Sequence, residues 1–275
     1  MPDKALTIVS AATVSLEAYA AAFTSAFRGY HHPVSHNAAT LALRVRVEQY
    51  DLENSLLGFD GGEVAGVAAL AVRGGRGWVA GLAVVPEQRG RGRGRELMSA
   101  LVGRVRAAGL RRLSLEVLAG NDAARRLYEW AGMRVTRDLL VMERPAGPAP
   151  GGAAPREAPA VELLPHFARM HPEPPAWQRE LSSLLAADLR GLYVGGRRRP
   201  RAYALLGPGR DAATTQVFDL GAADAAQAEA MCAALGRVPG ALRITNEPER
   251  SPFAAPLLRH GFAEVVRQHE MTVGW

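Results

Sequence analysis

The chain contains little of several features that would narrow its function at once. Its 275 residues include one cysteine, Cys232, so an intramolecular disulfide is impossible. No stretch approaches the ~20 apolar residues that a membrane-spanning helix needs. The first residues, MPDKALTIVS, lack the basic and apolar regions of an export signal. We therefore expect a cytoplasmic protein without a membrane partner.

Negative charge is also scarce. The sequence has 27 acidic and 33 basic residues, which gives a formal net charge of +6. A basic chain favours polyanionic partners such as nucleic acid, an anionic membrane or a phosphorylated cofactor. Nearly all of the positive charge is arginine in a chain rich in Ala, Gly and Pro, and such usage also follows from a GC-rich genome. Charge alone therefore does not decide the function.

Proline, glycine and alanine crowd one segment, PAGPAPGGAAPREAPA, at residues 145–160. It has no apolar periodicity and is typical of a linker. We expect it to separate a first domain over residues 1–144 from a second over residues 161–275, each of ordinary domain size.

The first half alternates strand and helix patterns. The predicted helices cover 16–27, 37–50, 93–108 and 122–131, and the predicted strands 5–9, 55–59, 64–72, 78–85, 113–117 and 138–143. This order predicts an α/β domain, of the α+β type with a mixed sheet, in which helices flank one twisted sheet.

The second half repeats this order in shorter form. Strands are predicted over 192–194, 202–206, 215–220, 241–245 and 266–273, with a helix over 223–235 and a short helix interrupted by Pro256. Aligning Gly132-Met133 with Gly261-Phe262 also aligns Met142 with Met271. This weak internal repeat predicts two domains of similar fold in tandem.

A glycine-rich segment, GLAVVPEQRGRGRGRELM, covers residues 81–98. A predicted strand ends near Val85 and a helix begins near Arg93. Glycines at 90, 92 and 94 allow the backbone to turn tightly. The amides of residues 90–95 can then point into one concavity, and the helix N-terminus adds unpaired N–H groups and about half a positive charge. Together with the arginines, this predicts a diphosphate site.

Two other interpretations of this loop remain. A dinucleotide-binding turn also places glycines between strand and helix, with an acidic residue about 20 positions later, close to Glu116. However, the spacing is G-x-G-x-G, four residues precede the first glycine, and several elements precede the turn. The alternation GRGRGR also suggests an RGG-like nucleic-acid segment. The flanking strand and helix patterns favour a folded loop, so we do not expect nucleic acid as the partner.

Two motifs resemble those of the GCN5-related N-acetyltransferases (GNATs). The run Arg89-Gly90-Arg91-Gly92-Arg93-Gly94 is similar to their motif Gln/Arg-x-x-Gly-x-Gly/Ala. Downstream, the run from Asn121 to Met133, NDAARRLYEWAGM, is similar to Asn-x-x-Ala-x-x-Leu-Tyr-x-x-x-Gly-Phe, with Met133 in place of the usual Phe. The resemblance covers about residues 5–144, and the second half resembles the family only in outline, as a degenerate copy.

The resemblance implies a sheet that splays beside its central strand, with acetyl-CoA in the cleft and no metal. The strand Leu82-Ala83-Val84 would pair with the pantetheine arm, and the loop from Arg89 to Arg95 would hold the pyrophosphate. Asn121 would contact the arm near the thiol, and Tyr128 would protonate the departing thiolate. The implied reaction is acetyl transfer to a primary amine of a small molecule or protein, by direct attack in a ternary complex.

The base that accepts the amine proton is less defined by sequence. Glu116 faces away from its apolar strand neighbours and could take the proton directly or through water, although a solvated or ion-paired carboxylate is the alternative. The cluster of His31, His32 and His36 could also serve, since histidine titrates near neutral pH. Tyr30 and Trp78 are candidates for the wall of the acceptor site or for core packing.

The second half lacks this machinery. No Arg-x-x-Gly-x-Gly precedes its predicted helix, and Leu257 aligns with Tyr128, so we expect it to bind no CoA. It would complete the acceptor pocket or form a dimer surface. Alternatives for the whole chain are a non-catalytic acyl-CoA sensor and, at lower rank, a transferase similar to mycothiol synthases, whose working domain is the C-terminal one.

Overall fold

The structure is a computed structural model that describes residues 5–30, 34–147, 155–209, 211 and 213–275. The backbone divides into two compact units. Unit 1 comprises Met1–Thr136 with Glu270–Trp275, and unit 2 comprises Arg137–His269. The units therefore change at residues 136/137 and 269/270, whereas the sequence suggested a linker at 145–160. The end of that predicted linker, Arg156–Pro159, is strand β7.

Unit 1 contains strands in the order β1-β2-β3-β4-β5. All neighbours are antiparallel except β4 and β5, which are parallel. The strands are β1 (Thr7–Ser10), β2 (Leu56–Asp60), β3 (Glu63–Arg73), β4 (Arg76–Val84) and β5 (Arg112–Leu118). The helices are α1 (Leu16–Ala26), α2 (Ala38–Arg44), α3 (Arg93–Ala107) and α4 (Asp122–Trp130), with 3₁₀ turns η1 at Ala11–Thr13 and η3 at Pro86–Gln88.

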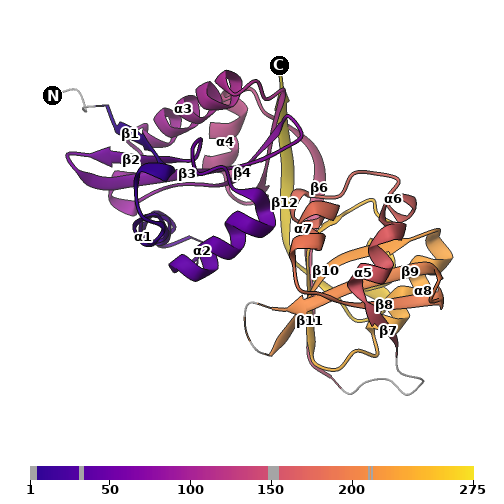
Figure 1. Ribbon diagram of the computed structural model, residues 1–275. Coiled ribbons are helices and arrows are strands. Elements are labelled where there is room, and N and C mark those ends of the chain that lie inside the picture. Colours follow the sequence, from indigo (N-terminus) through magenta and orange to yellow (C-terminus); the bar gives the residue numbers. More distant parts are fainter. Residues whose placement is uncertain (1–4, 31–33, 148–154, 210, 212) are drawn as a thin grey trace. The chain divides into compact units, whose positions relative to one another are not determined.

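Helices cover both faces of this sheet. Helices α1 and α2 lie on one face and α3 and α4 on the other (Figure 1). The apolar stripe of α3, with Leu97, Met98 and Leu101, is fully buried, as expected for an amphipathic helix on a sheet. Met98 and Leu101 share one core cluster with Leu70 of β3. The sheet is thus fixed between two helical layers, which sets the ends of its strands in place.

The predicted helix over 37–50 is divided in the structure. Helix α2 ends at Arg44 and one π-helical turn follows at Val45–Gln49. Gln49 has φ 60°, a conformation that a regular right-handed helix does not allow. Tyr50 then forms an isolated β-bridge with Ala71, so tertiary pairing ends the helix earlier than its pattern indicates.

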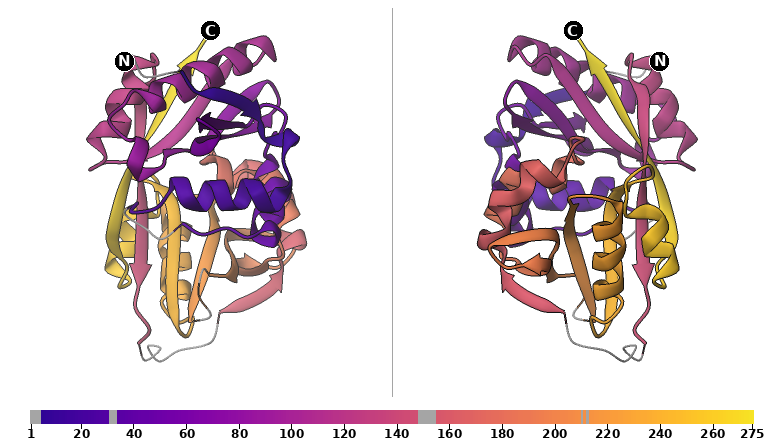
Figure 2. Two further views of the ribbon diagram at one scale, coloured as in Figure 1. Left: turned by 90° about the vertical axis from the view of Figure 1, so that its left-hand side faces the viewer. Right: turned by 90° about the vertical axis from the view of Figure 1, so that its right-hand side faces the viewer.

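Unit 2 contains strands in the order β6-β11-β10-β9-β8-β7. The strands are β6 (Arg134–Arg144), β7 (Arg156–Pro159), β8 (Arg190–Gly196), β9 (Arg199–Pro208), β10 (Thr214–Ala222), β11 (Ala241–Pro248) and β12 (Ala263–Gly274); β6 begins, and β12 ends, in unit 1. The helices are α5 (Ala160–Leu163), α6 (Phe167–Met170), α7 (Leu181–Ala186), α8 (Ala225–Leu235) and α9 (Ala254–Arg259). Figure 2 shows them from two further sides.

Strand β9 shows how this sheet is buried on both faces. Ala204 and Leu206 belong to the cluster that contains α8, whereas Tyr203 and Leu205 belong to the cluster that contains α5 and α6. Side chains alternate across a strand, so successive residues of β9 fill two separate cores. In each unit, helices flank strands of a mixed sheet, which confirms the predicted fold class.

The prediction that Pro256 interrupts a helix is wrong. Helix α9 runs through Pro256, which occupies its first turn. A proline in the first turn of a helix removes no hydrogen bond, because the first amides of a helix have no partner within that helix.

The suggested repeat has a matching local geometry. Gly132 and Gly261 have φ of 86° and 85°, and each follows the short helix of its half. The amide of Met133 donates to the Tyr128 carbonyl (3.0 Å), and the amide of Phe262 donates to the Leu257 carbonyl (3.1 Å). Leu257 thus occupies the backbone position that Tyr128 holds in the first half.

Candidate active site

Strands β4 and β5 separate shortly after they begin to pair. Their parallel register joins only Arg76 to Arg112, Gly77 to Leu113 and Trp78 to Ser114. The β3–β4 register shifts next to this point, between Ala69 and Leu70, which leaves Ala80 as an extra residue on β4. Among the described residues, no β-pairing joins 79–84 to β5. Leu82, Ala83 and Val84 therefore lie half-buried on a strand with one unpaired edge.

An aromatic row of α1 packs against the bulged part of β4. A Cβ at Gly81 would lie 2.7 Å from the Phe23 ring and 3.2 Å from the Phe27 ring. The two rings stack with centroids 4.8 Å apart, and Tyr30 meets Phe27 edge-on at 5.3 Å. Because Gly81 has no side chain, these rings approach the β4 backbone, and the row leads from the sheet to Tyr30.

The loop after β4 is open at two of its three glycines. Gly90 and Gly92 have φ of 78° and 82°, and a Cβ on either would meet nothing within 4 Å. Gly94 differs, since a Cβ there would lie 3.3 Å from Leu127 Cδ2. Gly90 and Gly92 thus shape the turn, whereas Gly94 allows α3 to approach α4.

The N-terminus of α3 is suited to an anion. Gly92 is its N-cap in the left-handed conformation and offers no capping side chain. The amides of Arg95 and Glu96 donate to the Gly92 carbonyl (2.9 and 3.2 Å), which starts the helix. In the described part of the chain, the amides of Gly90, Arg91, Gly92 and Gly94 donate to no backbone acceptor. Unpaired amides at a helix start are the donors that phosphate groups use, so the loop fits a diphosphate.

The loop arginines do not all face the same way, which corrects the expectation that their side chains jointly attract phosphate. The Arg89 guanidinium donates to the carbonyls of Val84 (3.0 Å) and Arg28 (2.7 Å). Arg93 is only 2% exposed and lies in ion pairs with carboxylates. Arg91 and Arg95 are exposed, and the Arg95 guanidinium lies 5.3 Å from the centroid of the Trp130 ring. The Arg89 amide also donates to the Pro86 carbonyl (3.3 Å), so Arg89 contributes neither a free guanidinium nor a free amide to the predicted phosphate site.

Tyr128, Asn121 and Tyr30 lie together at the α4 end of the site. Burial raises the pKa of Tyr128 well above its usual value, and the neighbouring Tyr30 acts in the same direction. Burial also raises the pKa of Tyr30, which a hydrogen bond with Asn121 partly opposes. Among the described residues, the Tyr128 hydroxyl makes no hydrogen bond. The Tyr128 hydroxyl is therefore protonated at neutral pH and can donate a hydrogen bond to a ligand.

Asn121 also has a local structural role. Its side-chain oxygen accepts a hydrogen bond from the Ala124 amide (3.2 Å) and caps α4. Asparagine is a preferred N-cap residue. The cap fixes the start of α4. Tyr128 lies two turns later on the buried side of the same helix.

Glu116 lies on β5 next to the point where the strands separate. Its carboxylate accepts a hydrogen bond of 2.8 Å from the indole N–H of Trp78, which is 3% exposed. The structure thus brings together the predicted base and one candidate wall residue. His36 lies beside the aromatic row, with its ring 5.0 Å from that of Phe23. His31 and His32 lie outside the described residues.

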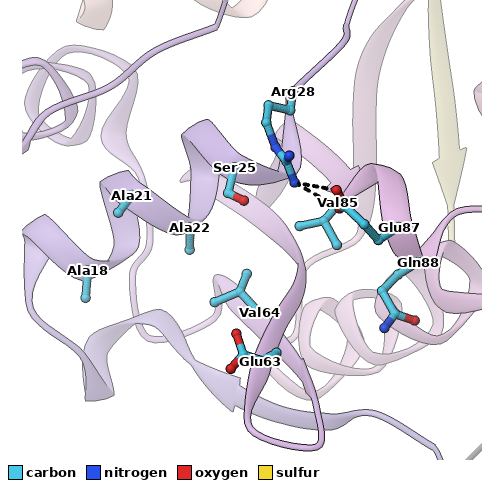
Figure 3. Close-up of a pocket in the computed structure, with 10 residues that line it drawn as sticks. All are labelled: Ala18, Ala21, Ala22, Ser25, Arg28, Glu63, Val64, Val85, Glu87 and Gln88. Atoms are coloured by element: carbon cyan, nitrogen blue, oxygen red, sulfur yellow. Dashed lines mark hydrogen bonds and ion pairs between the residues drawn. The ribbon is translucent and has the colours of Figure 1, made fainter.

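A separate hollow of about 490 Å³ lies between α1, the start of β3 and η3. Figure 3 shows the Arg28–Glu87 ion pair (2.9 Å) on its rim. None of the predicted site residues lines it. The small residues Ala18, Ala21 and Ala22, which follow helical spacing, are the sequence signal that could have indicated it.

Unit 2 has a similar strand separation that is closed by charge pairs. Strands β10 and β11 pair in parallel over Thr214–Val217 and Ala241–Ile244, and the register against β9 shifts after Val217. Arg179 then joins the two strands. Its guanidinium donates to Asp219 of β10 (3.2 Å) and to Glu247 of β11. All three are buried, so the gap between these strands is filled by protein.

The start of α8 is occupied as well. The Asp224 side chain caps this helix by accepting from the Gln227 amide (2.9 Å), and it pairs with Arg201 (3.0 Å). At the corresponding start of α3 stands Gly92, which has no side chain. A carboxylate at a helix N-terminus meets the charge that a phosphate would meet. Unit 2 therefore lacks an open phosphate site at α8.

A family model for the GNAT acetyltransferases matches residues 17–133. Residues 17–133, within unit 1, therefore form a domain of the GNAT superfamily. Its loop follows the fourth strand of a largely antiparallel sheet, unlike the doubly wound parallel sheet of the dinucleotide-binding alternative. A search of curated proteins gave no match.

Solved structures share the fold over almost the whole chain. A Pyrococcus horikoshii protein has 16% identity over 99% of this chain and 90% of its own, with a TM-score of 0.70. A GCN5-related N-acetyltransferase from Sphaerobacter thermophilus has 18% identity over 98% and 95%, with a TM-score of 0.67. A tandem GNAT protein from the clavulanic acid biosynthesis pathway has 14% identity over 98% of both chains and a TM-score of 0.66. A GNAT fold in tandem therefore accommodates this chain.

The family assigns the general chemistry of acyl transfer to this GNAT domain. Within the described residues, no three His, Cys, Asp or Glu side chains gather as a metal site would require. Over the same residues, no helix combines the length and the apolarity needed to traverse a membrane.

Proposed function

We propose that unit 1 transfers an acetyl group from acetyl-CoA to a primary amine of a small molecule or a protein. The observation that carries this proposal is the unpaired edge of β4, which continues directly into the loop of open amides at the start of α3. An amide-bearing arm that ends in a diphosphate has the groups to match both parts. We place the reaction in the cytoplasm, a compartment compatible with a single buried thiol.

The cofactor contacts divide between backbone and side chains. Leu82 and Val84 offer N–H and C=O groups of the strand edge to the pantetheine amides, whereas Ala83 between them pairs with Val67 of β3. The amides of Gly90, Arg91, Gly92 and Gly94 hold the diphosphate, and the exposed side chains of Arg91 and Arg95 add positive charge. Asn121, at the start of α4, borders the thiol end of the arm.

The acid and base roles follow from the protonation states. Acetyl-CoA supplies an activated acyl group with a thiol as its leaving group. The amine attacks the acyl carbon directly in a ternary complex, and the carbon–sulfur bond breaks.

Tyr128, whose burial keeps its hydroxyl protonated, gives its proton to the leaving thiolate. Glu116, positioned by Trp78, accepts the proton that the amine loses, directly or through water. A backbone amide of β4 near Val84 polarises the acyl carbonyl.

Unit 2 binds no CoA in this proposal. Its strand gap contains the Arg179 ion pairs, its helix α8 is capped by Asp224, and Leu257 stands where a tyrosine would be required. Each chain then carries one acetyl-CoA site and one acid, both within residues 1–144.

The test is a panel of amines incubated with acetyl-CoA and read by thiol release. The proposal predicts amine-dependent thiol release for at least one small amine or peptide N-terminus. Binding of CoA without turnover on any amine would favour the sensor alternative, and the absence of binding would contradict the proposal altogether.

A further inference from the structure

Asp60, the last residue of β2, contacts both ends of the phosphate loop. Gln88 precedes the loop and donates from Nε2 to Asp60 Oδ2 at 3.0 Å. Arg93 follows the loop and donates from Nη2 to the same oxygen at 3.1 Å. A single carboxylate oxygen therefore joins the residues on either side of loop 89–92. Figure 3 shows Gln88 at the end of η3.

Arg93 is held by a second carboxylate. Its Nη1 donates to Glu96 Oε1 at 2.9 Å, and the other Glu96 oxygen accepts from the Leu6 amide at 2.7 Å. Arg93 is 2% exposed, whereas Asp60 and Glu96 are 26% and 31% exposed. A buried guanidinium requires such partners, because an unpaired buried charge is strongly unfavourable. The side chain of Arg93 is therefore fixed in one direction, away from the loop opening.

Beyond Arg89, whose guanidinium donates to the Val84 and Arg28 carbonyls, few contacts hold the shape of the loop. Gly90 and Gly92 are exposed, and the space where their Cβ atoms would stand is empty. Glycine also has the widest choice of backbone conformations, so two glycines in four residues favour a mobile loop. Ordering such a loop upon binding would reduce affinity. The contacts of Gln88 and Arg93 with Asp60 fix both ends before a ligand arrives.

We propose that Asp60 is a positioning residue for diphosphate recognition, which acts by holding loop 89–92 in its binding conformation through Gln88 and Arg93. This inference rests on the proposed function, since it concerns the same cofactor. In this proposal Asp60 acts through Gln88 and Arg93 and not by direct contact with the cofactor. Its negative charge is balanced by Arg93, so it does not repel the phosphates.

The test compares Asp60→Asn in the full chain with wild type and with Glu63→Gln. The control removes a carboxylate three residues further along the same hairpin, where Glu63 is exposed. We expect Asp60→Asn to raise KM for acetyl-CoA and Kd for CoA about tenfold, since small misplacements of binding groups have effects of this order. We expect kcat at saturating acetyl-CoA to change less than about twofold, and Glu63→Gln to behave as wild type.

Acetyl-pantetheine, which lacks the diphosphate, separates positioning from general destabilisation. The kcat/KM for acetyl-pantetheine should be the same in Asp60→Asn and wild type. Equal KM values for acetyl-CoA in the two proteins would overturn the inference, as would an equal loss with acetyl-pantetheine.

If Asp60→Asn does not fold, the Gln88→Met variant tests the inference instead. Its Kd for CoA should rise about threefold, because one of the two contacts with Asp60 remains. If wild type itself binds no CoA, the proposed function fails, and not only this inference.

Discussion

The surroundings of Tyr128 explain why its hydroxyl stays protonated. It is buried at 7% exposure on α4, beside Tyr30, and its hydroxyl has no hydrogen-bond partner among the described residues. Burial in a low-dielectric environment disfavours the phenolate, so the pKa rises. A tyrosine kept neutral in this way holds its proton at neutral pH and can donate it to negative charge that develops on a leaving sulfur next to it.

The Tyr128→Phe variant should keep its affinity for CoA and lose turnover. Removal of a general acid lowers kcat by about 100-fold or more, whereas the ring continues to fill its place in the core. Because the pKa of Tyr128 is raised, its proton is retained at neutral and moderately alkaline pH, and wild-type kcat should not fall between pH 7 and about 10 through its ionisation. Steady-state kinetics across pH, with calorimetric titration of CoA, measure both effects. Equal kcat in the two proteins would exclude Tyr128 as the acid.

Single residues also mark the limit of what the sequence could predict. The glycine spacing and the Asn121–Tyr128 motif correctly indicated a loop and a helix start that the structure contains. The directions of the arginine side chains were not predictable, because Arg93 is turned inward by Asp60, a residue 33 positions away. Similarly, the pairing of Glu116 with Trp78 depends on the β4–β5 register and not on either local pattern.

At the scale of elements, the contact of α1 with β4 depends on one missing side chain. The Phe23 ring occupies the space that a Cβ at Gly81 would need, at 2.7 Å. The aromatic row thereby lies against the strand just where β4 leaves β5. Any side chain at this position must displace either α1 or the strand that carries the proposed cofactor contacts.

We therefore expect Gly81→Ala to lower the free energy of unfolding by about 1–3 kcal/mol, the usual cost of overpacking. The matched control is Gly103→Ala. Gly103 is exposed within α3 and a Cβ there meets nothing within 4 Å. Alanine is the better helix former, so the control should gain about 0.5–1 kcal/mol. Urea denaturation of both variants measures the difference, and a stabilised Gly81→Ala would refute the packing argument.

Elements with a strong apolar period were predicted close to their observed ends, as with α3 and β3. Short elements without such a period were not. The segment 160–186 forms α5, α6 and α7 of four to six residues each, too short to show a helical repeat in sequence. The end of α2 was also missed, since the π-helical turn depends on the tertiary bridge from Tyr50 to Ala71.

At the scale of the whole molecule, two units of related fold differ in whether the strand separation is open. In unit 2, Arg179 joins β10 to β11 through Asp219 and Glu247. The internal repeat could be predicted from sequence, because glycines and methionines recur at one spacing. The closure could not, because Arg179 lies between β7 and β8 and meets Asp219 and Glu247 only through the tertiary structure.

Removal of Arg179 should destabilise unit 2 strongly. In Arg179→Met, Asp219 and Glu247 stay buried without their cation, which costs about 3–5 kcal/mol. The control Arg190→Met removes an exposed partner of Glu157 (46% and 62% exposed) and should cost no more than about 1 kcal/mol. Chemical denaturation followed by the fluorescence of Trp177, which is buried in unit 2, measures both. Similar unfolding midpoints for the two variants would contradict the role of Arg179 as the closure of the strand gap.

The most direct measurement is a calorimetric titration of the intact wild-type chain with CoA. Saturable binding of one CoA per chain is the expected result, because among the described residues an unpaired strand edge that leads into open amides occurs in unit 1 alone. A chain that takes up no CoA, or two molecules of it, would contradict this account.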